Sequence, residues 1–310
     1  MTNHMVTIKV SAQLLARIEQ AYQHYLIENN GDYVLFRAKV GKTTITAYQN
    51  TKGKDAKVTF AGGDFTKEAS RWDPGITLFD IEDKEDEPLG WFDIEDQIGS
   101  DEVGTGDFLG PITVCAALVR KQDVAYLKKI GVTDSKKMTD EHIRFIASQL
   151  LKKFAYSQVS LNNEKYNELV NKGINLNEIK ARLHNRVLLN LLKRHPDVKH
   201  VYVDKFVSES RYFNYAARDV EIVSDITFKT KGESRFPSVA LASVIARYSF
   251  LKKMELLGKK YKTTLPFGAS HKVDEFAMSF IEKHGREELL KIAKGNFKNF
   301  TRIALKDDIK

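Results

Sequence analysis

Cysteine is almost absent from this chain, since Cys115 is the only one among 310 residues. A single thiol cannot form an intrachain disulfide or supply a thiolate-rich zinc site. Because Cys115 lies within an apolar run, we expect a small buried side chain and no catalytic thiol. The chain also lacks an apolar run of about 20 residues, the length that a membrane helix needs. Its start, Met1 to Thr7, is not a basic-then-apolar signal sequence, so a cytoplasmic protein is expected.

The charge of the chain is positive and unevenly distributed. The formal net charge is +8, with 49 Lys+Arg against 41 Asp+Glu. Residues 1–80 carry 10 basic and 8 acidic side chains, residues 81–97 carry 1 and 8, and residues 98–310 carry 38 and 25. The excess of positive charge therefore belongs mainly to the last segment. A basic surface of this kind favours a polyanionic partner, without identifying it.

The first 80 residues have the pattern of a small α+β domain with one open sheet face. The expected elements are a strand over 5–10, a helix capped by Ser11, strands over 33–40, 43–48 and 56–61, and a short helix over 65–72. The acidic cluster over 82–87 precedes Pro88, and it predicts a linker over 81–97. A metal site built from these acids is the less favoured alternative, because charge runs are usually solvated connectors.

Strands and helices alternate along the rest of the chain, which predicts an α/β sheet. The expected strands are the apolar run before residue 101 and those over 112–119, 158–161 and 198–203, and the expected helices cover 123–129, 139–154, 163–172, 177–194, 238–257, 273–284 and 287–293. Thr139 is the predicted cap of the second helix. Small side chains at Ala240, Ala242 and Ser243 should let the long helix pack closely on the sheet.

Two adjacent carboxylates, Asp101 and Glu102, lie where an apolar strand meets the turn Gly104-Thr105-Gly106. Neighbouring side chains on a regular strand point to opposite faces. The two acids can therefore serve one site only if the backbone bends there, which the glycines would allow. A polar hairpin turn with solvated acids is the alternative that this local pattern leaves open.

Four segments, in the same order along the chain, resemble the signatures of the type 2 ribonucleases H. They are Ser100-Asp-Glu-Val-Gly-Thr-Gly-Asp107, Thr133-Asp-Ser-Lys-Lys-Met138, Val201-Tyr-Val-Asp204, and Lys231-Gly-Glu-Ser-Arg-Phe-Pro237 with the apolar helix that follows. The resemblance implies an α/β, ribonuclease H-like catalytic domain over residues 98–310.

Three departures from the ribonuclease HII pattern point to ribonuclease HIII. Thr105 stands where ribonuclease HII usually has Arg, Glu233 stands where it has Asp, and an additional domain precedes the motifs. In the order of its elements, residues 1–80 resemble the TATA-binding-protein-like domain of ribonuclease HIII, which implies a role in substrate binding. The missing Arg puts in doubt an activity on single ribonucleotides embedded in DNA.

The resemblance implies an endonuclease that cuts the RNA strand of RNA/DNA hybrids with two metal ions. Asp101, Glu102, Asp204 and Glu233 would bind Mg²⁺ or Mn²⁺, which prefer hard oxygen ligands. Asp101 would bridge the two ions. Attack by water would leave 5′-phosphate and 3′-hydroxyl ends.

The same resemblance assigns substrate contacts. Backbone groups of Gly104, Thr105 and Gly106 would bind ribose 2′-hydroxyls. Ser135, Lys136 and Lys137 would bind phosphates, although an ordinary solvated turn is their alternative. No membrane or obligate protein partner is implied, and a monomer is expected. A hybrid-binding protein without activity and another metal nuclease of the superfamily, such as a resolvase, stay open as alternatives.

Overall fold

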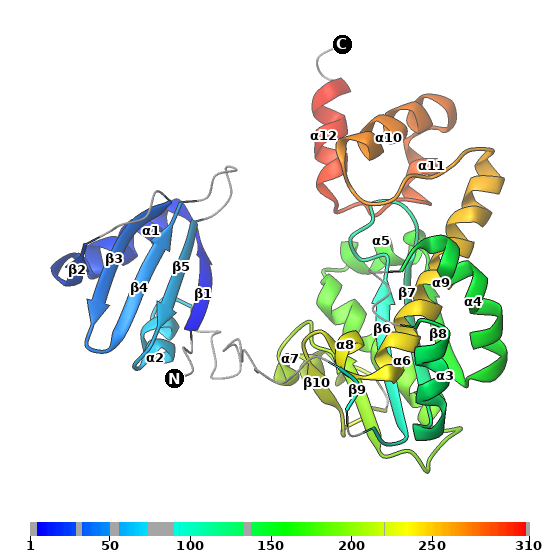
Figure 1. Ribbon diagram of the computed structural model, residues 1–310. Helices are drawn as coiled ribbons and strands as arrows, with labels where there is room; N and C mark the ends of the chain where they lie inside the picture. The colour runs from blue at the N-terminus through cyan, green and yellow to red at the C-terminus, as the bar shows by residue number, and fades with distance from the viewer. Residues whose placement is uncertain are drawn as a thin grey trace. The chain divides into compact units, whose positions relative to one another are not determined.

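The computed structural model describes residues 5–28, 33–49, 56–73, 90–92, 94–132, 138–219 and 221–307. Internal contacts divide the chain into two units, Met1–Pro88 and Leu89–Lys310, whose elements are labelled in Figure 1. None of the helices in these described ranges is both long and apolar enough to cross a membrane.

The first unit is a five-stranded antiparallel sheet with helices on one face. Its elements are β1 (Met5–Val10), α1 (Ala12–Ala21), β2 (Leu26–Ile27), β3 (Val34–Val40), β4 (Thr43–Tyr48), β5 (Ala56–Ala61) and α2 (Phe65–Ser70), and the strand order is β1-β5-β4-β3-β2. The Ser11 hydroxyl accepts the amide of Leu14 at 3.3 Å, which confirms the predicted cap. Strand β2 was not expected, because two residues are too few to show alternation.

Alternation along the strands separates a buried face from an open one. Val6, Ile8, Ile45 and Phe60 pack with Ile18 of α1 in one apolar core. The alternate positions form the open face that the alternation predicted. Its residues include no acidic side chain; they are Thr7, Lys9, Leu35, Arg37, Lys39, Thr44, Thr46, Tyr48, Lys57 and Thr59. A polar and basic sheet surface is thus exposed in this unit.

The second unit is built on a mixed five-stranded sheet. Its strands are β6 (Gln97–Val103), β7 (Ile112–Val119), β8 (Tyr156–Leu161), β9 (His200–Asp204) and β10 (Thr227–Lys229), in the order β10-β9-β6-β7-β8. Strand β6 is antiparallel to β7 and parallel to β9. The carboxyl ends of β6 and β9 consequently lie next to each other at one edge of the sheet.

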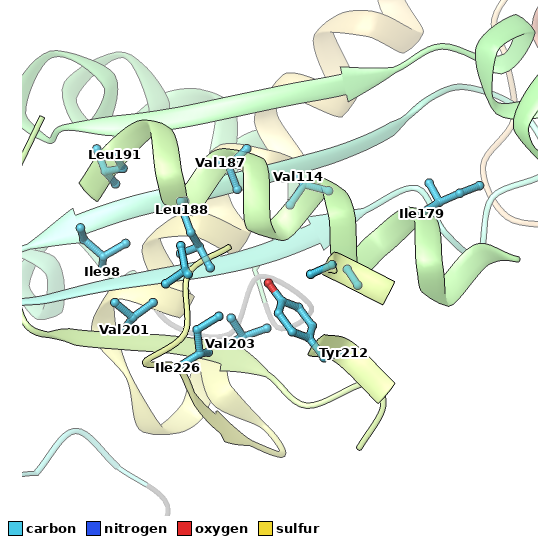
Figure 2. Packing of buried hydrophobic residues seen from close by; sticks show 14 of the residues in the cluster. Ile98, Val114, Ile179, Val187, Leu188, Leu191, Val201, Val203, Tyr212 and Ile226 are labelled. Atoms are coloured by element: carbon cyan, nitrogen blue, oxygen red, sulfur yellow. The ribbon is translucent and has the colours of Figure 1, made fainter. Parts of the chain in front are cut away.

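Helices cover both faces of this sheet, as its fully buried strand β7 requires. The helices are α3 (Val124–Lys129), α4 (Asp140–Lys153), α5 (Asn163–Asn171), α6 (Leu176–Leu192), α7 (Glu209–Ala216) and α9 (Pro237–Tyr261). Val114 and Ala116 of β7 pack with α6, whereas Cys115 and Ala117 pack with α4 and α9. Figure 2 shows the first of these cores, with Val187, Leu188 and Leu191 of α6 lying over the sheet.

Two local predictions hold in this unit. The Thr139 hydroxyl accepts the amide of His142 at 3.2 Å and caps α4. Helix α9 lies directly on β6 at Gly99, where an added Cβ would be 2.4 Å from Ser238 Oγ and 2.5 Å from the amide nitrogen of Val239. Glycine at position 99 is therefore required by the close packing that the small residues of α9 predicted.

The predicted linker over 81–97 lies partly outside the described residues, including its acidic cluster over 82–87. Its last residues belong to the second unit. Trp91 packs in the core under α9, and Gln97 begins β6. Short elements that were not expected are α7, β10, α8 (Gly232–Arg235) and the terminal α12 (Lys298–Asp307).

The C-terminal helices α10 (His271–His284), α11 (Arg286–Leu290) and α12 pack in one core with Phe250 and Met254 of α9. Phe108 and Leu109, which follow the glycine turn, are inserted into this core. The fully buried Lys294 donates from its Nζ to the carbonyl oxygens of Asp107 and Gly110, both at 2.7 Å. Burial lowers the pKa of Lys294 to about 7. The C-terminal segment thereby fixes the turn that follows β6.

Candidate active site

Asp101 and Glu102 point to opposite faces of the sheet. Strand β6 pairs with β7 in continuous register from Gln97 to Val103, so the backbone does not bend between the two acids. Glu102 is directed towards α6, and Asp101 towards Ser243 of α9. The chain turns only at Gly104, whose φ is +93° and where an added Cβ would be 2.2 Å from the carbonyl oxygen of Pro111.

Asp101 lies among other negative charges. Its Oδ1 accepts the amide of Glu102 at 2.8 Å, and its side chain is hydrogen-bonded to Ser243. Burial, followed by the charges of Glu102 and Asp204, raises the pKa of Asp101 well above its usual range. Asp101 is thus close enough to Glu102 and to Asp204 to be repelled by both charges. Such crowding is typical of sites where a cation or a proton compensates the charge.

Asp204 ends β9 and is joined to the segment that carries Glu233. Its Oδ1 accepts the amide of Gly232 at 2.9 Å, and an added Cβ at Gly232 would lie 3.3 Å from the Asp204 Cα. Glu233 is only 6% exposed. The segment was predicted as a loop but forms the one-turn helix α8, against which Trp91 donates from Nε1 to the carbonyl oxygen of Glu233 at 3.3 Å.

Glu102 is held by two side chains from one turn of α6. Lys180 Nζ lies 2.6 Å from its Oε1, and His184 Nε2 lies 3.0 Å from its Oε2. Burial alone would raise the pKa of Glu102, but the hydrogen bond from His184 and the charge of Lys180 together lower it below its usual range. Glu102 is therefore a carboxylate at neutral pH.

Lys180 and His184 were not predicted from the sequence. Their signal was their spacing of four residues, which places them on the same side of a helix. Both are buried, although the apolar stripe of this helix runs beside them through Ile179, Val187 and Leu191. Buried ionisable side chains require partners. Only the packing of α6 on β6 identified Glu102 as that partner.

The predicted substrate-binding residues are only partly described. Gly104 is buried, Thr105 is partly exposed and Gly106 is exposed, so the turn presents backbone groups at the surface. Asp107 Oδ1 accepts the amide of Gly268 at 2.6 Å and fixes the end of the turn. The other predicted contacts, Ser135, Lys136 and Lys137, lie outside the described residues.

The acids fit Mg²⁺ or Mn²⁺ by chemistry, since every predicted ligand is a carboxylate. The described residues contain no group of three or more His, Cys, Asp or Glu side chains already arranged to hold a metal ion. The direction of Glu102 gives a physical reason, because Lys180 and His184 hold it on the α6 side. Asp101 and Asp204 remain the central pair, and their mutual repulsion is what a divalent cation would relieve.

Known proteins resemble this chain over nearly its whole length. The family described as Ribonuclease HII matches residues 98–300, and a domain of unknown function (DUF3378) matches residues 5–77. Ribonuclease HIII of Bacillus cereus (strain AH187) is 40% identical over 306 residues, which are 96% of this chain and 97% of the relative; the Bacillus anthracis (strain CDC 684 / NRRL 3495) protein has the same values. The crystal structure of Bst-RNase HIII in complex with Mn²⁺ has a TM-score of 0.68 and 33% identity, covering 99% of this chain and 100% of that one.

Proposed function

This chain belongs to the ribonuclease HIII family and is a ribonuclease H, and we propose that it cuts the RNA strand of RNA/DNA hybrids by a two-metal-ion mechanism. The products would carry 5′-phosphate and 3′-hydroxyl ends. The observation that supports the mechanism best is Asp101, whose partly buried carboxylate lies near the charges of Glu102 and Asp204. Such a cluster is costly unless cations neutralise it.

We propose that all four acids bind the metal ions. Asp101 and Asp204, at adjacent strand ends, would hold the ions together with Glu233. Glu102 would join them from the other face of β6, because its charge is near enough to raise the pKa of Asp101. When bound, two divalent ions would activate a water molecule and stabilise both oxygens at the phosphate. Ser243 and the amide of Gly232 each hydrogen-bond one of the two aspartates, which orients their remaining lone pairs. The buried setting of Glu233 keeps its side chain away from bulk water.

We propose that the glycine turn, residues 104–106, recognises the RNA strand. Backbone groups of Gly104, Thr105 and the exposed Gly106 would hydrogen-bond ribose 2′-hydroxyls, which distinguish RNA from DNA. The anchoring of this turn by Lys294 and by Gly268 supports the role, because a rigid turn can select one sugar geometry. Ser135, Lys136 and Lys137 would bind the phosphates.

The proposal is tested by incubating the purified protein with an RNA/DNA hybrid, double-stranded RNA and branched DNA, with Mg²⁺, with Mn²⁺ and with excess chelator. We expect cleavage of the hybrid alone, and only with metal. Cleavage of branched DNA would favour a resolvase instead. Binding of the hybrid without any cleavage would favour a non-catalytic binding protein, and cleavage in chelator would exclude the metal mechanism.

We propose that residues 1–80 bind the hybrid through the open face of their sheet. Replacing Arg37 and Lys39 there with Gln should weaken hybrid binding and reduce its salt dependence by about one unit of log–log slope for each phosphate that the variant no longer neutralises. Turnover at saturating substrate should not change, because none of the four acids lies in this unit. Binding is measured by fluorescence anisotropy at several salt concentrations.

The matched control replaces Arg17 of α1 and Lys67 of α2 with Gln. These exposed cations belong to the helices that cover the opposite face, so the control removes the same charge from the same unit. Equal weakening by both double variants would mean that net charge, rather than the open face, attracts the hybrid.

A further inference from the structure

Two side chains from one turn of α6 contact the carboxylate of Glu102. The side chains of Lys180 and Glu102 are only 9% and 12% exposed, so their 2.6 Å contact is largely shielded from water. His184 has no exposed surface and occupies the other oxygen of the same carboxylate. Since a carboxylate can accept about four hydrogen bonds, these two contacts leave lone pairs for another partner. The two contacting groups nevertheless differ in their freedom to move.

The ring of His184 is held by contacts with Glu102, Ser100 and Phe206. Its Nδ1 lies 2.8 Å from the Ser100 hydroxyl, and its ring stacks on Phe206 with centroids 5.4 Å apart. Because the carboxylate of Glu102 can only accept, Nε2 of His184 donates the hydrogen bond to it. Ser100 and Glu102 are two residues apart on β6 and share a face. The ring therefore holds Glu102 in a fixed direction relative to its own strand.

Lys180 is held less rigidly. Its ammonium lies 3.8 Å from the centroid of the Phe206 ring, which attracts a cation independently of Glu102. A lysine side chain has a flexible stem and a compact charge. The ammonium can consequently withdraw from Glu102 while staying over the aromatic ring.

We propose that His184 is a positioning residue for Glu102 and that Lys180 is a counter-ion that competes with divalent cations for this carboxylate. The inference rests on the proposed function of Glu102 as a metal ligand. Lys180 neutralises one charge of the acidic cluster that also contains Asp101 and Asp204. When a divalent cation binds, two positive charges near one carboxylate repel, so Lys180 withdraws towards Phe206. The hydrogen bond from His184 is retained, because the contact with Ser100 and the stacking on Phe206 keep the ring in place.

The two roles predict effects of opposite sign on metal affinity. His184→Leu removes the orienting donor and should weaken Mn²⁺ binding by about 10- to 100-fold, as the loss of groups that orient ligands does. Lys180→Met keeps an unbranched apolar side chain but removes the competing charge, and should tighten Mn²⁺ binding by about tenfold. Both are measured on the full chain by calorimetric titration with Mn²⁺ and by the rise in melting temperature that Mn²⁺ causes.

Conservative variants and a matched control separate these roles from general damage to α6. His184→Gln retains an N–H donor and should recover part of the lost affinity, whereas Lys180→Arg retains the charge and should bind Mn²⁺ as the wild type does. Arg182→Met removes a cation from the same helix, but Arg182 pairs with Asp219 at 3.0 Å and does not contact Glu102. Its Mn²⁺ affinity should be unchanged.

Failure of the inference is distinguishable from failure of the proposed function. If the wild type cuts hybrids with Mn²⁺ but Lys180→Met binds Mn²⁺ equally or more weakly, the counter-ion role is overturned. If His184→Leu binds Mn²⁺ with wild-type affinity, the positioning role is overturned. If the wild type neither binds Mn²⁺ nor cuts hybrids, the proposed function itself fails.

Discussion

Asp101→Asn is expected to lower turnover on an RNA/DNA hybrid by about a thousandfold or more. The substitution keeps the shape and the oxygen that accepts the Glu102 amide, but it removes the charge that would hold metal ions. Loss of about 4 kcal/mol of charge stabilisation in the transition state corresponds to a thousandfold in rate. Single-turnover cleavage at saturating hybrid and Mg²⁺ measures the loss, and hybrid binding should stay within a fewfold of wild type.

The same substitution should stabilise the fold when metal is chelated. Burial and the neighbouring acids raise the pKa of Asp101, so ionising this group costs stability at neutral pH. Below about pH 4, which is near the pKa of an unperturbed Asp, the wild type and the variant should have the same melting temperature. As the pH rises towards neutrality, the wild type should lose stability relative to Asp101→Asn. A variant that melts lower than wild type throughout would contradict the crowding of charge around Asp101.

Glu233→Gln is expected to lower turnover nearly as much as Asp101→Asn does. Its melting temperature should be close to that of the wild type. The side chain is buried beside the segment that Gly232 ties to Asp204, where a carboxylate can serve a metal ion. If Glu233 instead only favoured the first turn of α8, its removal would cost about 0.3–1 kcal/mol of stability and little activity. Turnover and melting temperature of the same preparation separate the two roles.

Glu233→Asp is the matched variant for this position. It retains the charge on a side chain shorter by one methylene. Partial activity in Glu233→Asp together with a large loss in Glu233→Gln would support a metal ligand. Wild-type turnover in Glu233→Gln would leave a centre of Asp101, Glu102 and Asp204 alone.

Local patterns predicted those parts of the fold whose cause is local. Alternation along β4 and β5, the caps at Ser11 and Thr139, and the small residues of α9 each depend on a few neighbouring residues, and each agrees with the structure. The elements that were missed are β2, α7, β10, α8 and α12. Several of them are too short to show a period, and they form because the rest of the sheet or core is already in place.

The carboxylates of the candidate site were all identifiable from the four motif segments, but their directions were not. From the sequence, a shared site required a bend at Asp101 and Glu102, but β6 continues regularly and the chain turns at Gly104. The surroundings of each acid depend on which helix packs on the face of β6 to which its side chain points. Gly99 admits α9 on the side of Asp101, and Ile98 packs with α6 on the side of Glu102.

The sequence alone determined the residue chemistry of this protein: four dispersed acids without a cysteine among them, a glycine turn and a basic excess over residues 98–310. Tertiary structure decided which charges meet. Lys180 and His184 are distant from Glu102 in sequence, and no local pattern specifies that α6 crosses β6 at that point. Contacts between side chains on different elements follow from how those elements pack, because burial is a property of the assembled core.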